Sequence, residues 1–520
     1  MKKLLALLLA MFMLLTMVGC PADTNEPADT DPDTEDVSED ETDPPVKDPD
    51  DDGPNIDPPD WYGMLDYYNA EGNPETFTMM IRDDGDFYVE EFMVDLEAAG
   101  ENKTVLQEAT YERNSNVEEI MGVAFDFLPV KSADYKTKFF DDFQNGKNSF
   151  DMAGMQANLI GGMLNQGLLA DWNDVEYVDF EKEWWLSSAN QAEDLTINGH
   201  LWSITGDATN ISIGKILVMY FNKNLIENYT GMKADQFYNQ VVNAKTSAGT
   251  VGKWTIDYML NLTKDIWDDK NGNQEPDSGD FFGINFYLAT ICDNYFAAFD
   301  IPLVSQNEDG SYVIDLSGER VQIAWNKLAD MCYGSNNYCY LTSNKATSIT
   351  FFGSQGSLFT HGGLEWITNF LANDLNFEFS VIPYPKYNEA QESYKTTLSD
   401  VFSMLVISAE EDNLARVGAV AEAMGYESYN TTTEAYYETL LKGRGTYDTQ
   451  SKEMIDTIYH NYVSFDPGLI YGSALSYPNQ ILRSKVLNSR RGAKQWSSTW
   501  DKNKDTYQGK VDDLFNLDVE

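Results

Sequence analysis

The chain has 520 residues, 42% of them hydrophobic and 13% aromatic, so it can form more than one folded domain and is too rich in aromatic residues to be disordered throughout. It carries 85 Asp and Glu against 35 Lys and Arg, a formal net charge of −50. This excludes nucleic acid as a partner, because phosphate binding needs clustered Lys and Arg. An acidic binder of neutral ligands is the simpler interpretation.

Residues 1–19 have the layout of a secretory signal peptide. Two lysines precede an apolar run from Leu4 to Val18, which is shorter than the ~20 residues that a membrane-spanning helix needs. The run leads into Met-Val-Gly-Cys, which resembles the bacterial lipobox and predicts lipidation of Cys20. We therefore expect a protein of the cell membrane, lipid-anchored on the extracellular face. Ordinary secretion with cleavage near Cys20 is the alternative.

The next segment is acidic and rich in proline. Residues 21–60 hold 17 Asp and Glu and one Lys, with almost no large apolar side chain, so they cannot bury enough surface to offset the entropy of ordering. We assign residues 20–74 to the lipidated cysteine and a disordered linker.

From about residue 75, strand-like and helix-like segments alternate. A strand at 76–81 ends in the turn Asp83-Asp84-Gly85, a helix covers 111–121, and a strand covers 123–128. An amphipathic helix follows, with Ser132 as a candidate cap and Gly146 as its end. Its predicted buried face consists of Tyr135, Phe139, Phe140 and Phe143.

The stretch 150–172 begins as a short buried strand, continues through small and polar residues from Gly154 to Gly162, and becomes helix-like up to Gly167. Ligands of open α/β sheets bind at such strand ends, although a plain connection is the alternative. A second alternating unit starts near residue 210, with a strand at 216–221 and a helix from about 256. This order predicts α/β lobes with mostly parallel sheets and a cleft between them.

Catalytic motifs are mostly missing: the chain has no HExxH, no GxSxG, no glycine-rich phosphate loop, and three dispersed histidines. A carboxylate pair for glycoside hydrolysis stays open as an alternative, since acidic residues are abundant. We expect the protein not to be an enzyme and to require no cofactor.

One loop has the oxygen spacing of a calcium site. Its side chains fall at positions typical of a loop that wraps a hard cation, but Gln274 stands where Gly is usual and the last position is Asp in place of Glu. The candidate ligands of a structural calcium are Asp269, Asn271, Asn273, Glu275, Asp277 and Asp280. A metal-free network of Asx turns is the alternative.

Three cysteines follow Cys20. Cys332 and Cys339 are close enough in sequence for a disulfide outside the cell, and the apolar surroundings of Cys292 predict a buried thiol. The chain has no CxxC motif, which argues against a thiolate zinc site.

Several tryptophans stand near Asp, Asn and Gln, the combination that a sugar needs for ring stacking and hydroxyl recognition, although burial is the usual fate of any one tryptophan. Trp185 with Asp207 is the pair that we single out.

The order of several short motifs resembles family 1 of the extracellular solute-binding proteins of ABC importers, the group that includes maltose-binding protein. The motifs are the stretch 150–172, Ile-Asn-Gly-His-Leu-Trp at 197–202 followed by Gly206-Asp207, and Met-Tyr-Phe-Asn-Lys-Asn-Leu at 219–225. The resemblance covers about residues 75–520.

The resemblance implies a two-lobed periplasmic-binding-protein type II clamp, each lobe a mixed, mostly parallel sheet flanked by helices, with hinge crossovers. Lobe 1 would comprise 75–207 plus about 357–428, and lobe 2 about 208–356 plus 429–520. By position, the resemblance implies ligand contacts at Asp83, Asp84, Gln156, Asn158, Asp207 and Trp366, with Tyr477 as a weaker match. Met155 and Leu159 depart from the family pattern, and Trp185 could supply the platform that they lack.

The implied function is capture of a carbohydrate, an oligosaccharide in our interpretation, by closure of the clamp and its delivery to an ABC permease. We expect a monomer. A secreted carbohydrate-active enzyme, a surface adhesin, and a binding protein for a cationic or peptide solute remain alternatives.

Overall fold

The computed structural model describes residues 57–164, 166–287, 291–334, 339–368, 375–399, 401–441, 449–478, 480 and 496–516. The predicted signal peptide, Cys20 and the acidic segment up to residue 56 lie outside this range, as does the side chain of Cys292. Residues 58–74 belong to the compact unit that begins at Pro58, where the Tyr67 N–H donates to Met121 O at 2.8 Å. The predicted linker, which we extended to residue 74, is therefore too long, because residues 58–74 pack on the folded unit.

The first sheet has four strands in the order β14-β3-β1-β2. Strand β1 is parallel to β2 and β3, and β14 is antiparallel to β3. The bounds are Glu75–Arg82 (β1), Val123–Val130 (β2), Met152–Gln156 (β3) and Ser403–Val406 (β14). The alternation predicted for residues 75–156 thus forms one mostly parallel sheet.

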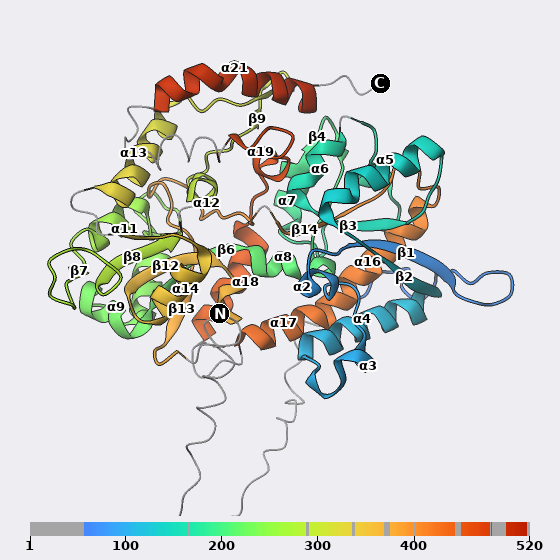
Figure 1. The fold of residues 1–520 in the computed structure, drawn as a ribbon, viewed down its shortest axis with the longest axis horizontal. Coiled ribbons are helices and arrows are strands. Elements are labelled where there is room, and N and C mark those ends of the chain that lie inside the picture. Colours follow the sequence, from blue (N-terminus) through green and yellow to red (C-terminus); the bar gives the residue numbers. More distant parts are fainter. Residues whose placement is uncertain are drawn as a thin grey trace, which may run out of the picture. The chain divides into compact units, whose positions relative to one another are not determined.

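Helices flank this sheet and pack on one another (Figure 1). A capping box between Thr104 and Gln107 starts α4, which ends at Gly122 with a φ of 63°. Helix α16 packs on α4, and α6 packs on β3. The bounds are Asp86–Val89 (α2), Leu96–Ala99 (α3), Val105–Met121 (α4), Tyr135–Asn145 (α5), Ala157–Leu164 (α6), Ser188–Leu195 (α7), Leu414–Asn430 (α16) and Thr432–Leu441 (α17).

The amphipathic helix α5 ends at Gly146, as predicted, but its buried face is narrower than predicted. Tyr135 and Phe139 are buried, whereas Phe140 and Phe143 are 39% and 41% exposed. The aromatic pattern therefore overstated the width of the face that packs on the fold.

The second sheet has the strand order β11-β8-β12-β6-β13, with β7 paired to β8. Strand β8 is parallel to β11 and β12, whereas β6 is antiparallel to β12 and β13. The bounds are Leu217–Asn222 (β6), Trp267–Asp268 (β7), Phe281–Tyr287 (β8), Cys339–Thr342 (β11), Ser357–Gly363 (β12) and Phe379–Ile382 (β13). Two short hairpins stand apart, Thr196–Ile197 (β4) with His200–Leu201 (β5), and Ser305–Gln306 (β9) with Tyr312–Val313 (β10).

Helices α9, α11, α14 and α18 contact the second sheet, and α13 contacts its edge strand β11. The bounds in this part are Lys223–Thr230 (α9), Ala234–Phe237 (α10), Ile256–Thr263 (α11), Ile291–Ala298 (α12), Glu319–Tyr333 (α13), Lys345–Gly353 (α14) and Thr449–Thr457 (α18). Each sheet thus has its own helices and its own core, which makes two lobes.

The chain passes between the lobes through paired extended segments. Ile204 lies opposite Leu405, and Ile216 opposite Leu398, in antiparallel bridges. Between these bridges lies the short helix Ile211–Lys215 (α8). Backbone hydrogen bonds join Leu217 N to Thr397 O at 3.0 Å and Ser399 N to Lys215 O at 2.9 Å. These segments connect the two lobes, where we expect the hinge crossovers.

The predicted division of the later chain needs a correction. We assigned about 357–428 to lobe 1, but β12 and β13 belong to the second sheet, and the chain returns to the first sheet only at β14. Strand β12 is buried along its whole length between β6 and β8. A strand buried on both sides carries no pattern that says which sheet it joins, which is why the sequence could not settle this boundary.

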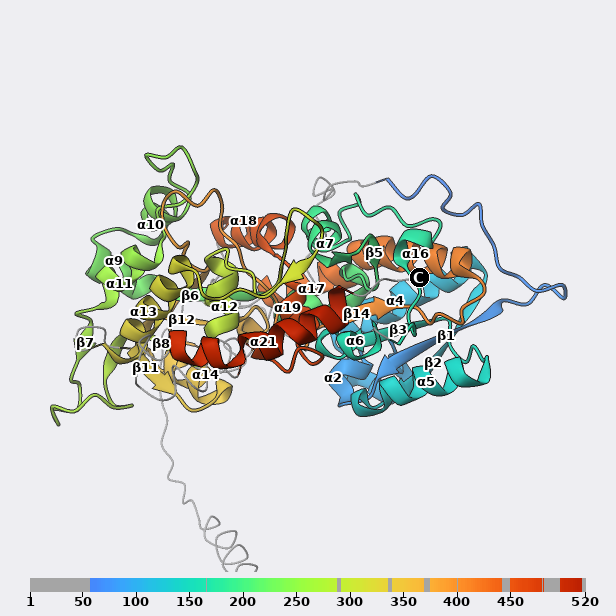
Figure 2. The ribbon, with the colours of Figure 1, turned by 90° about the horizontal axis from the view of Figure 1, so that it is seen from above.

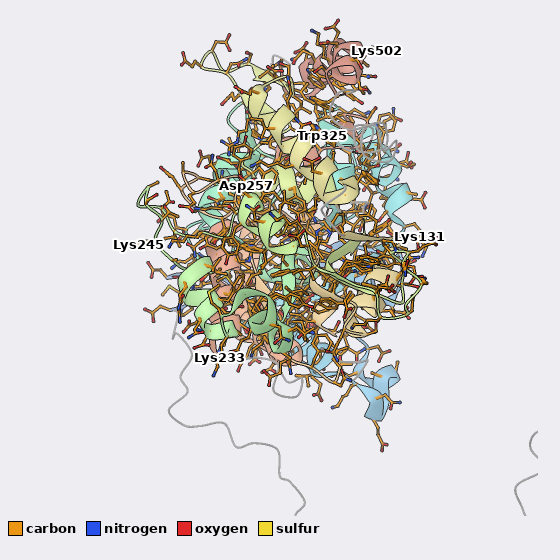
Figure 3. The ribbon with its side chains drawn as sticks, turned by 90° about the vertical axis from the view of Figure 1, so that its left-hand side faces the viewer. Lys131, Lys233, Lys245, Asp257, Trp325 and Lys502 are labelled. Carbon is orange, nitrogen blue, oxygen red and sulfur yellow. The ribbon has the colours of Figure 1, made fainter. Side chains whose placement is uncertain are left out.

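The C-terminal helix Trp496–Phe515 (α21) packs on α13 and β10 through a row of aromatic rings. Trp325 on α13 stacks on Trp496 with ring centroids 5.1 Å apart, and Trp496 stacks on Trp500. Figure 2 shows α21 as a long surface helix, and Figure 3 places Trp325 beside it, with Lys502 further along α21. The short helix Pro467–Ile470 (α19) packs on α6. No helix among the described residues is both long and apolar enough to span a membrane.

Candidate functional site

A cavity of about 300 Å³ lies beside the hinge. Its walls come from both lobes: Tyr88 belongs to α2 of the first lobe, Lys345 starts α14 of the second, and Lys215 lies on the hinge. The complete lining is Tyr88, Lys215, Leu217, Tyr287, Lys345, His361, Gly362, Gly363, Glu365, Trp366, Ser399 and Val401. The volume is at the lower end of the range of small-molecule sites, and aromatic walls with few polar groups are typical of them.

Trp366, for which the sequence predicts a ligand contact, forms an aromatic wall of this cavity. The ring is 4% exposed and lies parallel to Tyr220 at 6.5 Å. Gly362 makes this position available, because a Cβ there would lie 2.2 Å from Trp366 Cε2. The lack of a side chain on Gly362 therefore leaves room for the Trp366 ring.

Glu365 joins two lysines at the cavity wall. Lys215 Nζ lies 2.5 Å from Glu365 Oε2, and Lys345 forms an ion pair with Oε1 of the same carboxylate. Burial raises the pKa of Glu365, but the positive charges of the two lysines outweigh it and hold the pKa below its ordinary value. Lys215 also lies 5.4 Å from the ring of Phe87, within the range of a cation–π contact.

Burial keeps His361 neutral, and a chain of hydrogen bonds assigns its tautomer. Asn294 Nδ2 donates to Tyr384 Oη at 2.6 Å, so the Tyr384 hydroxyl proton is directed to His361 Nδ1, also at 2.6 Å. The proton of the neutral imidazole is thereby assigned to Nε2. Burial lowers the pKa of His361 to about 3, so the ring adds no charge to the cavity at neutral pH.

The predicted acidic contacts Asp83 and Asp84 stand behind the cavity wall. Arg82 Nε lies 2.7 Å from Asp84 Oδ2, and Lys131 Nζ lies 3.0 Å from Asp83 Oδ2. The Arg82 guanidinium lies 3.7 Å from the ring centroid of Tyr88 and donates to Val401 O at 3.0 Å. Asp84 thus holds Arg82 beside the lining residue Tyr88, whereas Asp83 pairs with the exposed Lys131, and neither carboxylate is a lining residue. Figure 3 shows Lys131 at the rim of the molecule.

Gln156 and Asn158, the predicted ligand contacts of this stretch, lie together at the end of β3 and the start of α6. Gln156 Nε2 donates to Asn158 Oδ1 at 2.6 Å. Neither residue lines the cavity. Gln156 pairs with Ser403 on β14, a short distance along the chain from the lining residue Val401.

Trp185 and Asp207 are interior residues, which corrects the prediction that they face a ligand. Trp185 is 1% exposed, and its Nε1 donates to Glu422 Oε2 at 3.0 Å. Asp207 is also 1% exposed and accepts from the Tyr459 hydroxyl, and burial raises the pKa of Asp207 to about 7. Trp185 is not among the lining residues of the cavity, and its indole N–H is bonded to Glu422, so the missing aromatic wall is not Trp185.

Tyr477 is half-buried and lies outside the cavity lining. Its φ is 50°, and its N–H donates to Gly472 O at 2.8 Å. The predicted late aromatic contact thus closes a turn after α19.

The acidic loop 269–280 is a network of Asx turns. Asp269 Oδ1 accepts from the N–H groups of Gly272 and Asn273, and Oδ2 accepts from Gln274 N at 2.8 Å. Asn271 and Asn273 both donate to Asp277, Glu275 N donates to Asn273 Oδ1, and Asp280 Oδ2 accepts from Asp277 N. Among the described residues, no group of three or more His, Cys, Asp or Glu side chains is arranged to hold a metal. Calcium binding stays a prediction.

The predicted disulfide is not formed, since Cys332 and Cys339 are both free cysteines in the structure. Burial raises the pKa of both thiols, so neither is an activated thiolate. Cys332 faces the core from α13 and Cys339 begins β11, so proximity in sequence was not enough to pair them.

Sequence reasoning missed most of the lining, including Tyr88, Lys215, Tyr287, Lys345 and His361. The sequence contained only a weak signal that these residues line a cavity. Lys215 comes shortly after Gly206-Asp207, in the segment that we had placed at the passage between lobes, and cations are scarce in so acidic a chain. Lys345 and Tyr287 had no local pattern that set them apart from surface residues.

No family model matches the chain, and no curated protein matches its sequence. Solved structures do match it in fold. A cyclo/maltodextrin-binding protein complexed with maltotetraose gives a TM-score of 0.53 at 15% identity, over 84% of this chain and 98% of the other.

Two further structures agree. The cyclic alpha-maltosyl-1,6-maltose binding protein from Arthrobacter globiformis gives a TM-score of 0.52 at 15% identity, over 86% of this chain and 100% of the other. The GacH receptor of Streptomyces glaucescens, solved unliganded and with acarbose, gives 0.51 at 13% identity, over 85% and 99%. The chain has the two-lobed α/β fold of periplasmic-binding-protein-like structures, and the predicted fold class is confirmed.

Proposed function

We propose that the chain is the solute-binding component of an ABC importer and that it captures a carbohydrate by closing its lobes. The observation that carries this proposal is the position of the cavity, beside the hinge segments and with walls from both lobes. A ligand that touches Tyr88 and Trp366 together favours the closed arrangement, because it gains both contacts only there.

The lining supports a sugar as the ligand. Trp366, Tyr88 and Tyr287 offer apolar ring surfaces, while Lys215, Glu365 and Ser399 offer hydrogen-bonding groups. Sugars need both kinds of surface, since their C–H faces stack on rings and their hydroxyls need donors and acceptors. The fold neighbours named above are described as binding proteins for maltodextrins, a cyclic maltose derivative and acarbose. We infer an oligosaccharide, and membership of family 1 of the extracellular solute-binding proteins.

Two parts of the proposal rest on sequence. The lipobox-like residues before Cys20 support a lipid anchor on the extracellular face of the cell membrane, and the acidic segment after it would serve as a spacer. Delivery of the sugar to an ABC permease follows from the family resemblance.

A scattering experiment tests the clamp. The protein is measured alone and with saturating ligand, after a thermal-shift screen of mono- and oligosaccharides, with amino acids and polyamines as controls. Ligand at about 100 times its Kd should add ~2.7 kcal/mol to the free energy of unfolding, and the radius of gyration should fall. An unchanged radius at saturation would contradict closure.

The other functional classes make different predictions. An enzyme would release products from an oligosaccharide, and chromatography would detect them. Glycoside hydrolysis uses a pair of carboxyl groups, whereas Glu365 is the one carboxylate among the described lining residues. An adhesin would bind polymer without compaction. For a cationic or peptide solute, the amino-acid and polyamine arms of the screen would give the shift.

A further inference from the structure

The described lining residues of the cavity carry a net positive charge, whereas the chain as a whole is acidic. Its described lining contains two lysines, Lys215 and Lys345, and one carboxylate, Glu365, while His361 is neutral, so these residues sum to +1. The whole chain has a net charge of −50. Arg82 behind Tyr88 is paired with Asp84 and leaves this sum unchanged.

From this charge balance we propose that the ligand is an acidic saccharide with one carboxylate, a uronic-acid sugar in chemical class. This inference rests on the proposed function and narrows its substrate. The sugar carboxylate lies near Lys345 and Lys215, and its ring packs against the aromatic walls.

The placement of the lysines favours an anion. The Lys215 side chain is 8% exposed, and Lys345 next to it is 45% exposed. Both ammonium groups share the carboxylate of Glu365, so each keeps donors for a second partner. Among the described residues these two ammonium groups share one counterion, so another negative charge stabilises them, and the low dielectric of the cleft strengthens that attraction.

A carboxylate fits better than a phosphate monoester. One negative charge neutralises the +1 of the lining, whereas a phosphate monoester carries about −1.5 to −2 at neutral pH and would leave a buried excess. The described cationic groups of the lining are the ammonium groups of Lys215 and Lys345. Recognition thus depends on side-chain ammonium groups.

Matched pairs of disaccharides test the inference by isothermal titration calorimetry. Cellobiouronate is compared with cellobiose, and maltobiouronate with maltose, since each pair differs in one carboxylate. We expect the acidic member to bind at least tenfold tighter, by about the strength of one hydrogen bond to a charged group. That preference should shrink when salt rises from about 0.02 M to about 0.2 M.

Two substitutions should act in opposite directions. Lys345→Gln should weaken binding of the acidic ligand about tenfold more than it weakens binding of the neutral one. Glu365→Gln raises the charge of the lining by one and should tighten the acidic ligand. Lys395→Gln is the matched control, because Lys395 is 42% exposed and pairs with Asp300 at 2.7 Å outside the cavity.

The outcomes separate this inference from the proposed function. If the acidic and neutral members of each pair bind equally well, or the neutral sugar binds more tightly, the inference of an acidic ligand is wrong and the proposed sugar-binding function is unaffected. If glucose 6-phosphate or a sulfated sugar binds more tightly than the acidic disaccharides, the inference that the ligand's charged group is a carboxylate is wrong. If no saccharide binds to a protein that still melts cooperatively, both the acidic ligand and the proposed sugar-binding function are wrong.

Discussion

Gly362 and Trp366 fit so closely that a Cβ on the glycine would lie 2.2 Å from the indole ring. The tryptophan needs that space to form the cavity wall. Gly362→Ala must therefore displace the indole or the strand. We expect a loss of ~1 to 3 kcal/mol in the free energy of unfolding, the usual cost of overpacking, together with weaker ligand binding.

Urea denaturation measures the stability of this variant, and calorimetry measures its binding. Gly318→Ala is the control, because a Cβ there meets no atom within 4 Å and the backbone has an ordinary φ of −58°. If Gly362→Ala were as stable as Gly318→Ala and bound ligand normally, the close fit would be unimportant.

Two neighbouring glycines of α6 should respond in opposite ways to alanine. A Cβ on Gly161 would lie 2.8 Å from Tyr471 Cβ and 2.9 Å from its carbonyl oxygen, whereas a Cβ on Gly162 meets nothing within 4 Å. Gly161→Ala should destabilise by ~1 to 3 kcal/mol. Gly162→Ala should stabilise by up to ~1 kcal/mol, because alanine is the better helix former.

Thermal melting of the two variants under identical conditions checks this contrast. The shifts in Tm should have opposite signs. Equal shifts would mean that α6 does not pack against the turn after α19 in solution.

Glu422 should make stability fall as pH rises. Burial raises its pKa from 4.5 to about 8, so between these values the folded protein keeps a proton that the unfolded chain releases. The free energy of unfolding then decreases with pH, by up to ~1.4 kcal/mol per pH unit for one proton. Glu422→Gln cannot ionise and can still accept from Trp185 Nε1, so its stability relative to the natural protein should increase from pH 5 to pH 8.

Urea denaturation at several pH values tests this prediction. Glu410→Gln, an exchange on a half-buried carboxylate near the surface, serves as the control. A stability difference that is the same at pH 5 and pH 8 would show that Glu422 does not carry the proton.

The protein should be more stable with glycine than with glutamine at position 274. Its φ is 62°, a conformation that disfavours side chains, and it lies at the loop position where calcium-binding loops have Gly. Gln274→Gly should stabilise by up to ~1 kcal/mol, because the relief of ~1 to 2 kcal/mol of left-handed strain exceeds the ~0.4 to 1 kcal/mol of entropy gained by the unfolded chain. Glu275→Gly is the control, since Glu275 has an ordinary φ and should gain nothing from the exchange.

Differential scanning calorimetry without added metal measures both variants. If Gln274→Gly melts at or below the temperature of Glu275→Gly, the left-handed turn costs nothing measurable. The comparison needs no assumption about calcium.

The sequence by itself determined the local structure and the fold class. Alternating apolar patterns predicted the strands and helices of the first lobe, and Gly146 ends α5 as predicted. Gly122 ends α4 in the same left-handed conformation, which glycine tolerates. The order of the motifs predicted two lobes. These features depend on residues near one another in the chain.

Only the tertiary structure decided which polar residues form the cavity. Trp366 was predicted and lines it, but Trp185 and Asp207 turned out to be interior, because a sequence cannot tell a buried ring from one that faces a cleft. Lys215 and Glu365 come together across 150 positions of the chain, and Lys345 joins them, through the hinge, the segment after β12 and the start of α14. Contacts between distant segments depend on how the two sheets pair and cross, and no local pattern of side chains specifies that.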